Sequence, residues 1–367
     1  MRRRSRAKAG TKKVPNRKAK RIRRSAHRHA PRNKMSRVVE PLGMGTIPLS
    51  YEETLLEDII RGSNGGVSRQ VYALTGALAS LTPKLRDVYF SHGFRVGEIL
   101  YRSAKHIAGN AATTMLPMLV EFFGNAGYSN ISYRLRGGSY EFEIADAPRM
   151  KLGVNMHSFE AGIISGFMSN EYRRITTFTE SECRSNGSDS CIFVEGTGMG
   201  EKRLDSDEWI REFSNYVIGS ADDERHGSIN YEYYYLASES LLHNEYAKGI
   251  SDIAYIAGSG LGRRLLEEHE GIGGAARIRR LKELIALLNF GNITIKRSAP
   301  MSLHMEFDRL MAKKDMIALA SNFMNGMLNA YLGKRLIETQ RSSFGKYTID
   351  VREAAQGVRN TRRAHRK

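Results

Sequence analysis

The sequence predicts an α+β protein built as a tandem duplication of a helix-plus-antiparallel-sheet domain with disordered basic tails. Three observations lead to this prediction. Segments about 165 residues apart align without a gap, long stretches carry apolar residues at helical spacing beside short β-branched runs, and basic residues gather at the two ends. A period of this length indicates domain duplication, because solenoid repeats are far shorter. With 367 residues, 41% of them hydrophobic, the chain can form two domains of ordinary size.

The basic tails come first along the chain. Residues 1–36 contain 16 Lys and Arg and no Asp or Glu, and residues 359–367 contain five more basic residues. Taking these 21 charges from the net charge of +18 leaves −3 for the residues between them. The first tail has too few apolar residues to offset its ordering entropy, so we expect it to be disordered alone.

Nucleic-acid binding is the leading interpretation of these tails, because cations that neutralise phosphates release condensed counterions. A merely solubilising tail, a mitochondrial transit peptide that lacks the usual apolar stripe, and an anionic membrane surface are the alternatives. No apolar run is long enough for a signal peptide core or a transmembrane helix. The basic residues expected to contact phosphate are Arg2, Arg3, Arg4, Arg6, Lys12, Lys13, Arg17, Lys18, Lys20, Arg21, Arg23, Arg24, Arg362 and Arg363.

Each predicted copy consists of a helix, a glycine-marked helix, a third helix, two strands, a long helix and a hairpin. The glycine-marked helices align so that Gly93 and Gly97 match Gly258 and Gly262. Glycine inside a helix costs about 1 kcal/mol relative to Ala, so glycines on one helix face indicate a close approach. That approach can lie within a domain, between the two copies, or against a ligand.

The expected domain organisation follows from the repeat. It comprises a basic tail (1–37), a linker with a lead-in helix (38–63), the first domain (64–195), a second linker with a helix (196–225), a degenerate second copy (226–351) and a basic C-terminal tail (352–367). In the second linker, Trp209 and Phe213 begin an amphipathic helix that we expect to pack between the copies. The run Tyr231–Tyr235 favours strand and sheet packing over a nucleobase-stacking surface.

Four residues in the first copy are candidate metal ligands: His157, Glu180, Cys183 and Cys191. A helix over 159–172 precedes a predicted hairpin whose strands include 175–179 and 192–194, with turn-forming residues between the cysteines. Such a hairpin brings the two cysteines together beside the glutamate, and the helix start places the histidine over them. These residue types suit a tetrahedral zinc site. The spacing alone is also compatible with a disulfide or with two unrelated buried thiols.

The motif around these ligands resembles a known domain family. The stretches Met156–Ser169, Arg174–Cys183 and Gly187–Cys191 are similar to the 4-vinyl-reductase-type domain, a hydrocarbon-binding and TRAPP-like family that includes the sensory module of aromatic-responsive transcription activators. The resemblance is strongest over 84–195 and fainter over 226–351. It implies tandem copies of that fold, and the tails lie outside it.

The resemblance also implies a cofactor. In the activators a Cys, a Glu and two further Cys bind zinc, and Glu180, Cys183 and Cys191 match this pattern, whereas His157 stands where a Cys is expected. We therefore expect one zinc ion per chain, structural because protein fills all four positions. The second copy has no cysteine and lacks the site.

A small hydrophobic or aromatic ligand is a further implication of the resemblance. The residues expected to line its cavity are Phe94, Tyr128, Phe142 and Phe167. Such a ligand needs a cavity of roughly 300 Å³ or more, and these bulky side chains favour a filled interior.

The motifs do not favour an enzyme. A nucleophile turn with a Ser–His–Asp set, a phosphate-cradling loop and a His-Glu-x-x-His helix are all missing from the sequence, and His92 and His106 are expected to be core residues. We expect a non-enzymatic nucleic-acid-associated scaffold, whose tails grip phosphate and whose domains contact a protein partner or form a homodimer. The alternative is a small-molecule-responsive transcription regulator. A cytoplasmic location, with nucleoid or ribosome association, is expected because two cysteines do not form a secreted disulfide scaffold.

Overall fold

The computed structural model describes residues 51–62, 65–109, 113–148, 150–196, 206–219, 227–242, 247–272, 274–287, 296–298, 302–307, 314–332, 336–343 and 346–353. The chain divides into two compact units, Met1–Ile47 and Pro48–Lys367, and the described residues all belong to the second. The predicted basic tail 1–37 lies outside the described residues, and so does the predicted tail 352–367, except that Arg352 and Glu353 belong to the last strand and not to a tail.

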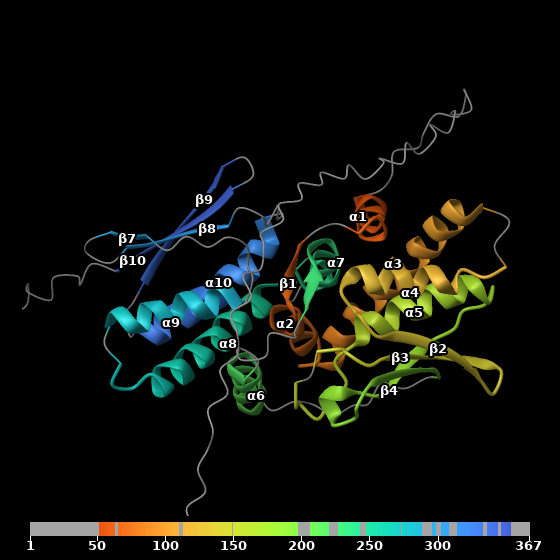
Figure 1. Ribbon diagram of the computed structural model, residues 1–367, viewed down its shortest axis with the longest axis horizontal. Helices are drawn as coiled ribbons and strands as arrows, with labels where there is room; N and C mark the ends of the chain where they lie inside the picture. Colours follow the sequence, from red (N-terminus) through yellow and green to blue (C-terminus); the bar gives the residue numbers. More distant parts are fainter. Residues whose placement is uncertain are drawn as a thin grey trace, which may run out of the picture. The chain divides into compact units, whose positions relative to one another are not determined.

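The structure confirms the α+β fold, and it repeats one order of elements (Figure 1). The first half contains α1 (Tyr51–Ile60), β1 (Gly66–Ser68), α2 (Arg69–Ala79), α3 (Pro83–Ala108), α4 (Leu116–Ala126), β2 (Ile131–Arg136), β3 (Ser139–Ile144), α5 (Ser158–Glu171), β4 (Phe178–Glu182) and β5 (Cys191–Glu195). The second half contains α6 (Ser206–Gly219), β6 (Ser228–Asn230), α7 (Tyr231–Leu242), α8 (Ala247–Glu268), α9 (Gly274–Leu287), β7 (Lys296–Ser298), β8 (Ser302–Phe307), α10 (Lys314–Leu332), β9 (Leu336–Ser343) and β10 (Lys346–Glu353). Helices and strands alternate identically in the two lists, apart from a short 3₁₀ turn in the first half.

Each half has a four-stranded antiparallel sheet with the same topology. The strand order is β2-β3-β5-β4 in the first half and β7-β8-β10-β9 in the second. In the first sheet Phe142 pairs with Phe193 and Ile144 pairs with Cys191. Helix α5 covers this sheet and is itself covered by α3, so every residue from Ser158 to Ser169 is buried (Figure 1).

The two halves meet at a symmetric junction. Strands β1 and β6 pair antiparallel with Val67 opposite Ile229, and each strand runs directly into a helix. Ser68 Oγ caps α2 by accepting from the Val71 N–H at 3.3 Å. Asn230 Oδ1 caps α7 by accepting from the backbone N–H of the second and third residues of that helix. Each half therefore contributes an equivalent strand and an equivalent capped helix to the junction.

The lead-in helices also pack across this junction. Helix α1 contacts α3 and α7, and α6 contacts α8 and α2. Trp209 and Phe213 on α6 are buried, and the Phe213 ring lies 5.7 Å from that of Phe323 on α10. A helix thus lies where the sequence predicts an amphipathic one, and it contacts both halves.

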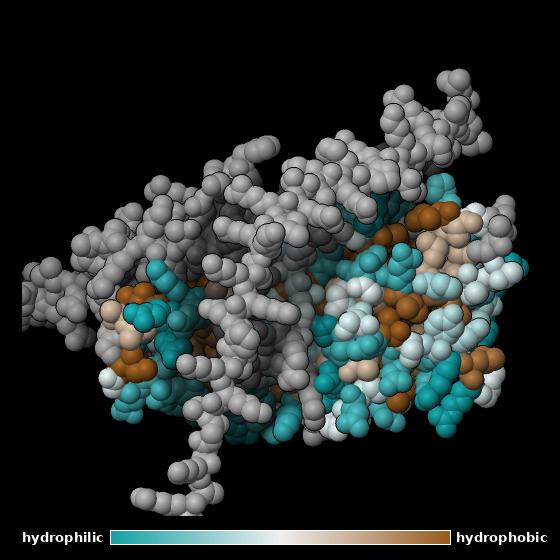
Figure 2. All heavy atoms as spheres, in the orientation of Figure 1, coloured by the Kyte–Doolittle hydropathy of each residue, from teal (hydrophilic) through white to brown (hydrophobic). Residues whose placement is uncertain are grey.

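Apolar side chains are mostly inside the described part of the protein. On the face drawn in Figure 2, single apolar side chains stand among polar ones. The exposed large hydrophobic residues are Tyr51, Ile107, Tyr133, Leu135, Ile175, Tyr255 and Ile256. Scattered exposure of this kind is ordinary for a globular surface.

The paired glycines mark close helix contacts within each half. A Cβ atom on Gly93 or Gly97 would overlap a backbone carbonyl oxygen of α5, and one on Gly258 or Gly262 would overlap a carbonyl oxygen of α10. The sequence leaves open whether these glycines approach a helix of the same domain, the other copy or a ligand. In the structure they approach a helix of the same domain.

Replacing Gly97 by Ala is expected to destabilise the protein by about 1–3 kcal/mol, because the new methyl group meets backbone that cannot move aside. Gly124→Ala is the matched control, since Gly124 also lies in a helix but has nothing within 4 Å of the added Cβ. The control is expected to be neutral or stabilising. Denaturant midpoints measure both, and a Gly97→Ala midpoint at or above that of Gly124→Ala would contradict the close contact.

Two local predictions were wrong. The run Tyr231–Tyr235 begins α7 and is not a strand, because Asn230 caps a helix there and Tyr233 and Tyr234 pack into the interior. His106 is exposed in the last turn of α3 and is not a core residue. A basic side chain is stabilised at that position by the helix dipole.

Candidate metal centre

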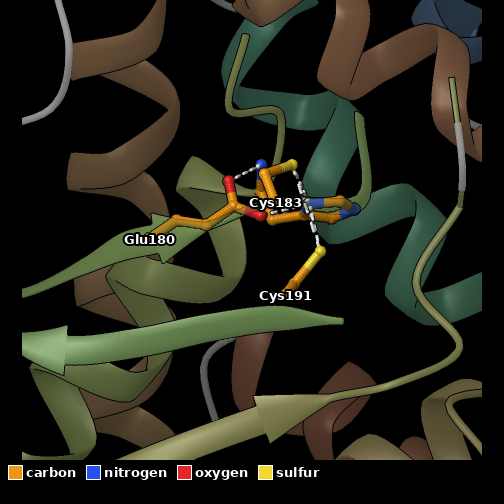
Figure 3. Close-up of side chains that lie close together, drawn as sticks. Glu180, Cys183 and Cys191 are labelled. Carbon is orange, nitrogen blue, oxygen red and sulfur yellow. Dashed lines mark hydrogen bonds and ion pairs between the residues drawn. The ribbon is translucent and has the colours of Figure 1, made fainter. Parts of the chain in front are cut away.

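The four predicted ligands come together in the first half. One donor atom from each of His157, Glu180, Cys183 and Cys191 lies within 4.8 Å of the others, and all four residues are buried. Figure 3 shows Glu180, Cys183 and Cys191 pointing toward a common centre. The hairpin and the start of α5 both contribute, as the sequence predicts.

Local backbone structure sets the positions of the cysteines. The register of β4 against β5 shifts between Glu180 and Glu182, and this irregularity precedes Cys183. The Cys183 carbonyl then accepts from the N–H groups of Asn186 and Ser188, at 2.9 and 3.1 Å, which turns the chain back toward Cys191.

Glu180 ties the helix start to the hairpin. Its Oε2 accepts from the backbone N–H of His157 at 3.1 Å, and its Oε1 lies 2.8 Å from Nδ1 of the same residue. The side-chain amide of Asn155 donates to the backbone carbonyl of Glu180. The Arg184 N–H donates to Cys191 Sγ at 3.4 Å, and such a donor stabilises a thiolate. Asn155 and Arg184 are supporting residues that sequence reasoning missed, because nothing in their local pattern marks them.

The pKa values of Glu180 and His157 are both raised in the metal-free cluster. Burial, together with Cys183, raises the pKa of Glu180 to about 7, although His157 opposes this rise. Burial lowers the pKa of His157, but Glu180 and Cys183 outweigh it and leave that pKa well above its usual value. Both pKa shifts favour the protonated forms of Glu180 and His157 in the metal-free cluster.

The pKa values of the two thiols are shifted in opposite directions. Burial raises the pKa of Cys183, but hydrogen bonds from Cys191 and His157 outweigh it and lower that pKa to about 3. Burial and the hydrogen bond to Cys183 raise the pKa of the Cys191 thiol. The lowered pKa of Cys183 favours its thiolate, the form that binds metal.

The donor separations scatter around those of a tetrahedral metal ion, and His157 Nδ1 and Glu180 Oε1, at 2.8 Å, lie closer together than two ligands of one ion. Bond lengths of about 2.0–2.3 Å imply donor separations of roughly 3.3–3.8 Å. The two sulfur atoms lie 4.0 Å apart, and His157 Nδ1 lies 3.4 Å from Cys191 Sγ and 3.7 Å from Cys183 Sγ. Both cysteines are free, and a disulfide requires about 2.05 Å. Within the described residues this is the only such group of His, Cys, Asp and Glu.

The ring orientation assigns the ligand nitrogen of His157. Nδ1 faces the carboxylate and both sulfur atoms, whereas Nε2 is buried and has no hydrogen-bond partner among the described residues. A metal would bind at Nδ1 and leave the proton on Nε2.

The four residues expected to line a ligand cavity each pack against another ring. The Tyr128 ring packs on Phe123, that of Phe142 on Phe178, that of Phe167 on Tyr101 and that of Phe94 on Phe90. No ring contact among the described residues joins two of the four. A groove of about 410 Å³ lies between α6 and α8. Five of its nine lining residues are charged, namely Asp207, Arg211, Arg263, Arg264 and Glu267, whereas a hydrophobic ligand needs an apolar wall.

The remaining predictions concern other parts of the chain. The fourteen basic residues expected to contact phosphate all lie outside the described residues. No described helix has the length and apolar character needed to cross a bilayer. No protein-family model, curated protein sequence or solved structure significantly matches this chain.

Proposed function

We propose that this chain is a non-enzymatic, nucleic-acid-associated scaffold whose first half is clamped by one structural zinc ion. The convergence of four buried donors, His157 with Glu180, Cys183 and Cys191, carries the zinc proposal. A set of one nitrogen, one oxygen and two sulfur donors suits Zn²⁺, which tolerates mixed ligands without a strong geometric preference. With four protein ligands no position stays open for water or substrate, and this supports a structural role over a catalytic one.

The zinc ion would link α5 to the β4–β5 hairpin. The histidine comes from the helix start and the other three ligands come from the hairpin, so one ion would reinforce the hydrogen bonds that already join these two elements. The second half has the same element order and the same strand order, which supports the proposed duplication.

Purified protein is expected to contain one zinc ion per chain by elemental analysis. The chain has only two cysteines, both proposed as ligands, so thiol titration provides a clean control. Both thiols are expected to react faster after a chelator removes the metal, while denatured protein gives two thiols in either case. Protein prepared without chelator that contains no zinc would contradict the clamp.

Charge segregation supports the nucleic-acid part of the proposal. Residues 1–36 and 359–367 carry 21 of the 57 basic residues, and the chain between them has a net charge of −3. A near-neutral body with highly basic ends suits a scaffold anchored through its ends, because phosphate attraction needs no fixed tail structure. The packing of Phe94, Tyr128, Phe142 and Phe167 against other rings favours this scaffold over a ligand-responsive regulator.

A further inference from the structure

A second buried polar cluster lies one helical turn from the metal ligands. Glu160, only 1% exposed, accepts hydrogen bonds at the same oxygen, Oε1, from three tyrosine hydroxyls. Tyr72 donates from α2, Tyr128 follows α4 at 2.6 Å, and Tyr233 donates from α7 at 3.2 Å. Burial and the nearby carboxylate raise the pKa of each of these three tyrosines, so their hydroxyls remain protonated donors.

The cluster and the metal centre share the first turn of α5. Glu160 follows His157 by three residues, which places the two side chains one turn apart on the helix. The His157 carbonyl accepts from the Ala161 N–H at 3.0 Å, so this first turn is formed at the ligand itself. Glu180 holds the turn from the hairpin side, and the tyrosines hold it from the side of α2 and α7.

One of the three donors comes from the other half of the chain. Tyr233 belongs to α7, and its backbone N–H donates to the capping Asn230 at 3.1 Å. Its ring also contacts Phe122 and Phe159, at 5.8 and 5.7 Å. The β1–β6 junction therefore fixes the position from which the Tyr233 hydroxyl reaches α5.

The second half has no counterpart of this carboxylate. The carbonyls of Phe159 and Phe323 face the equivalent glycines Gly93 and Gly258, which aligns α5 with α10 and places Met324 at the position of Glu160. Met324 is fully buried. A buried carboxylate costs far more than a methionine unless its partners compensate, so the half that keeps one has a use for it. That half is the one with the metal ligands.

We propose that Glu160 and Tyr233 are positioning residues of the metal centre, through which α7 of the second half holds His157 in place as a ligand. The inference rests on the proposed zinc clamp. It predicts that metal binding and the docking of α7 stabilise each other, since both fix the same helical turn.

The test removes one hydroxyl from α7 in the full-length protein. Tyr233→Phe keeps the ring and deletes the donor, whereas the control Tyr234→Phe deletes the neighbouring hydroxyl, which is also buried but lies outside the three that bond to Glu160 among the described residues. Zinc release to a chromogenic chelator is expected to be roughly fivefold faster in Tyr233→Phe, since one hydrogen bond to a charged group is lost. Release from Tyr234→Phe is expected to stay within about twofold of wild type.

A second measurement uses metal-free protein. Hydrogen exchange of the amides at 158–162 is expected to be faster in Tyr233→Phe than in Tyr234→Phe, because the hydroxyl positions this turn before metal binds. Equal zinc release from the two variants overturns the coupling and leaves the clamp standing. Wild-type protein that binds no zinc overturns the clamp, and equal exchange in the two metal-free variants then overturns the positioning role as well.

Discussion

Deletion of residues 1–36 is expected to remove most of the protein's affinity for nucleic acid and most of the salt dependence of that affinity. This segment carries 16 Lys and Arg and no acidic residue. Each phosphate that a protein neutralises contributes about 0.9 to the slope of log K against log salt on duplex DNA. If half of the 16 cations contact phosphate, the slope falls by roughly seven and affinity near physiological salt falls at least a hundredfold. Titrations at several salt concentrations measure both quantities.

A shuffled tail is the matched control. A chain with the residues of 1–36 in random order is expected to bind like wild type, because phosphate attraction depends on charge and not on tail sequence. Unchanged binding by the deletion variant would place the interaction on the folded body. The exposed basic residues of α9, Arg279, Arg280 and Lys282, would then be the first substitutions to make.

Local chemistry explains why the cluster of candidate metal ligands could be predicted from sequence. The turn residues between Cys183 and Cys191 specify a hairpin end, and the apolar spacing after His157 specifies a helix start, so both signals lie within 35 residues of each other. The α+β class follows from the same local patterns, and so does the order of elements in each half, apart from the short strands β1 and β6 and the start of α7. The sequence pattern could not predict the irregularity in β4 that precedes Cys183, because this irregularity depends on how β4 pairs with β5.

The missed features depend on contacts between distant parts of the chain. Glu160 stands out in the sequence only as one acid in an apolar helix, and its partner Tyr233 lies 73 residues away with no local signal that joins them. The tyrosine run at 231–235 has strand-forming composition. It nevertheless forms a helix, because Asn230 caps the helix start and the Tyr233 ring packs against Phe159 of α5. The glycine spacing on α3 indicates a close neighbour but cannot name α5.

Cys183→Ser is expected to abolish tight zinc binding and to lower the free energy of unfolding by about 3–5 kcal/mol, the usual cost of breaking a buried charged cluster. Serine lacks the thiolate that Zn²⁺ binds. Removal of this thiolate leaves Glu180 and His157 buried beside an incomplete set of ligands. Nucleic-acid affinity and its salt slope are expected to stay at wild-type values, because the tails do not depend on the clamp. Chemical denaturation and salt titration on one preparation measure both effects.

Chelator treatment separates loss of metal from loss of packing in this variant. If zinc carries the stabilisation, metal-free wild-type protein unfolds near the midpoint of Cys183→Ser, and the variant hardly responds to chelator, so the two perturbations are not additive. If the unfolding free energies of wild type and Cys183→Ser instead differ by the same amount with and without chelator, the cysteine acts as a packed core residue and the zinc clamp is wrong. A selective loss of nucleic-acid binding in a variant of unchanged stability would instead assign the metal centre to recognition.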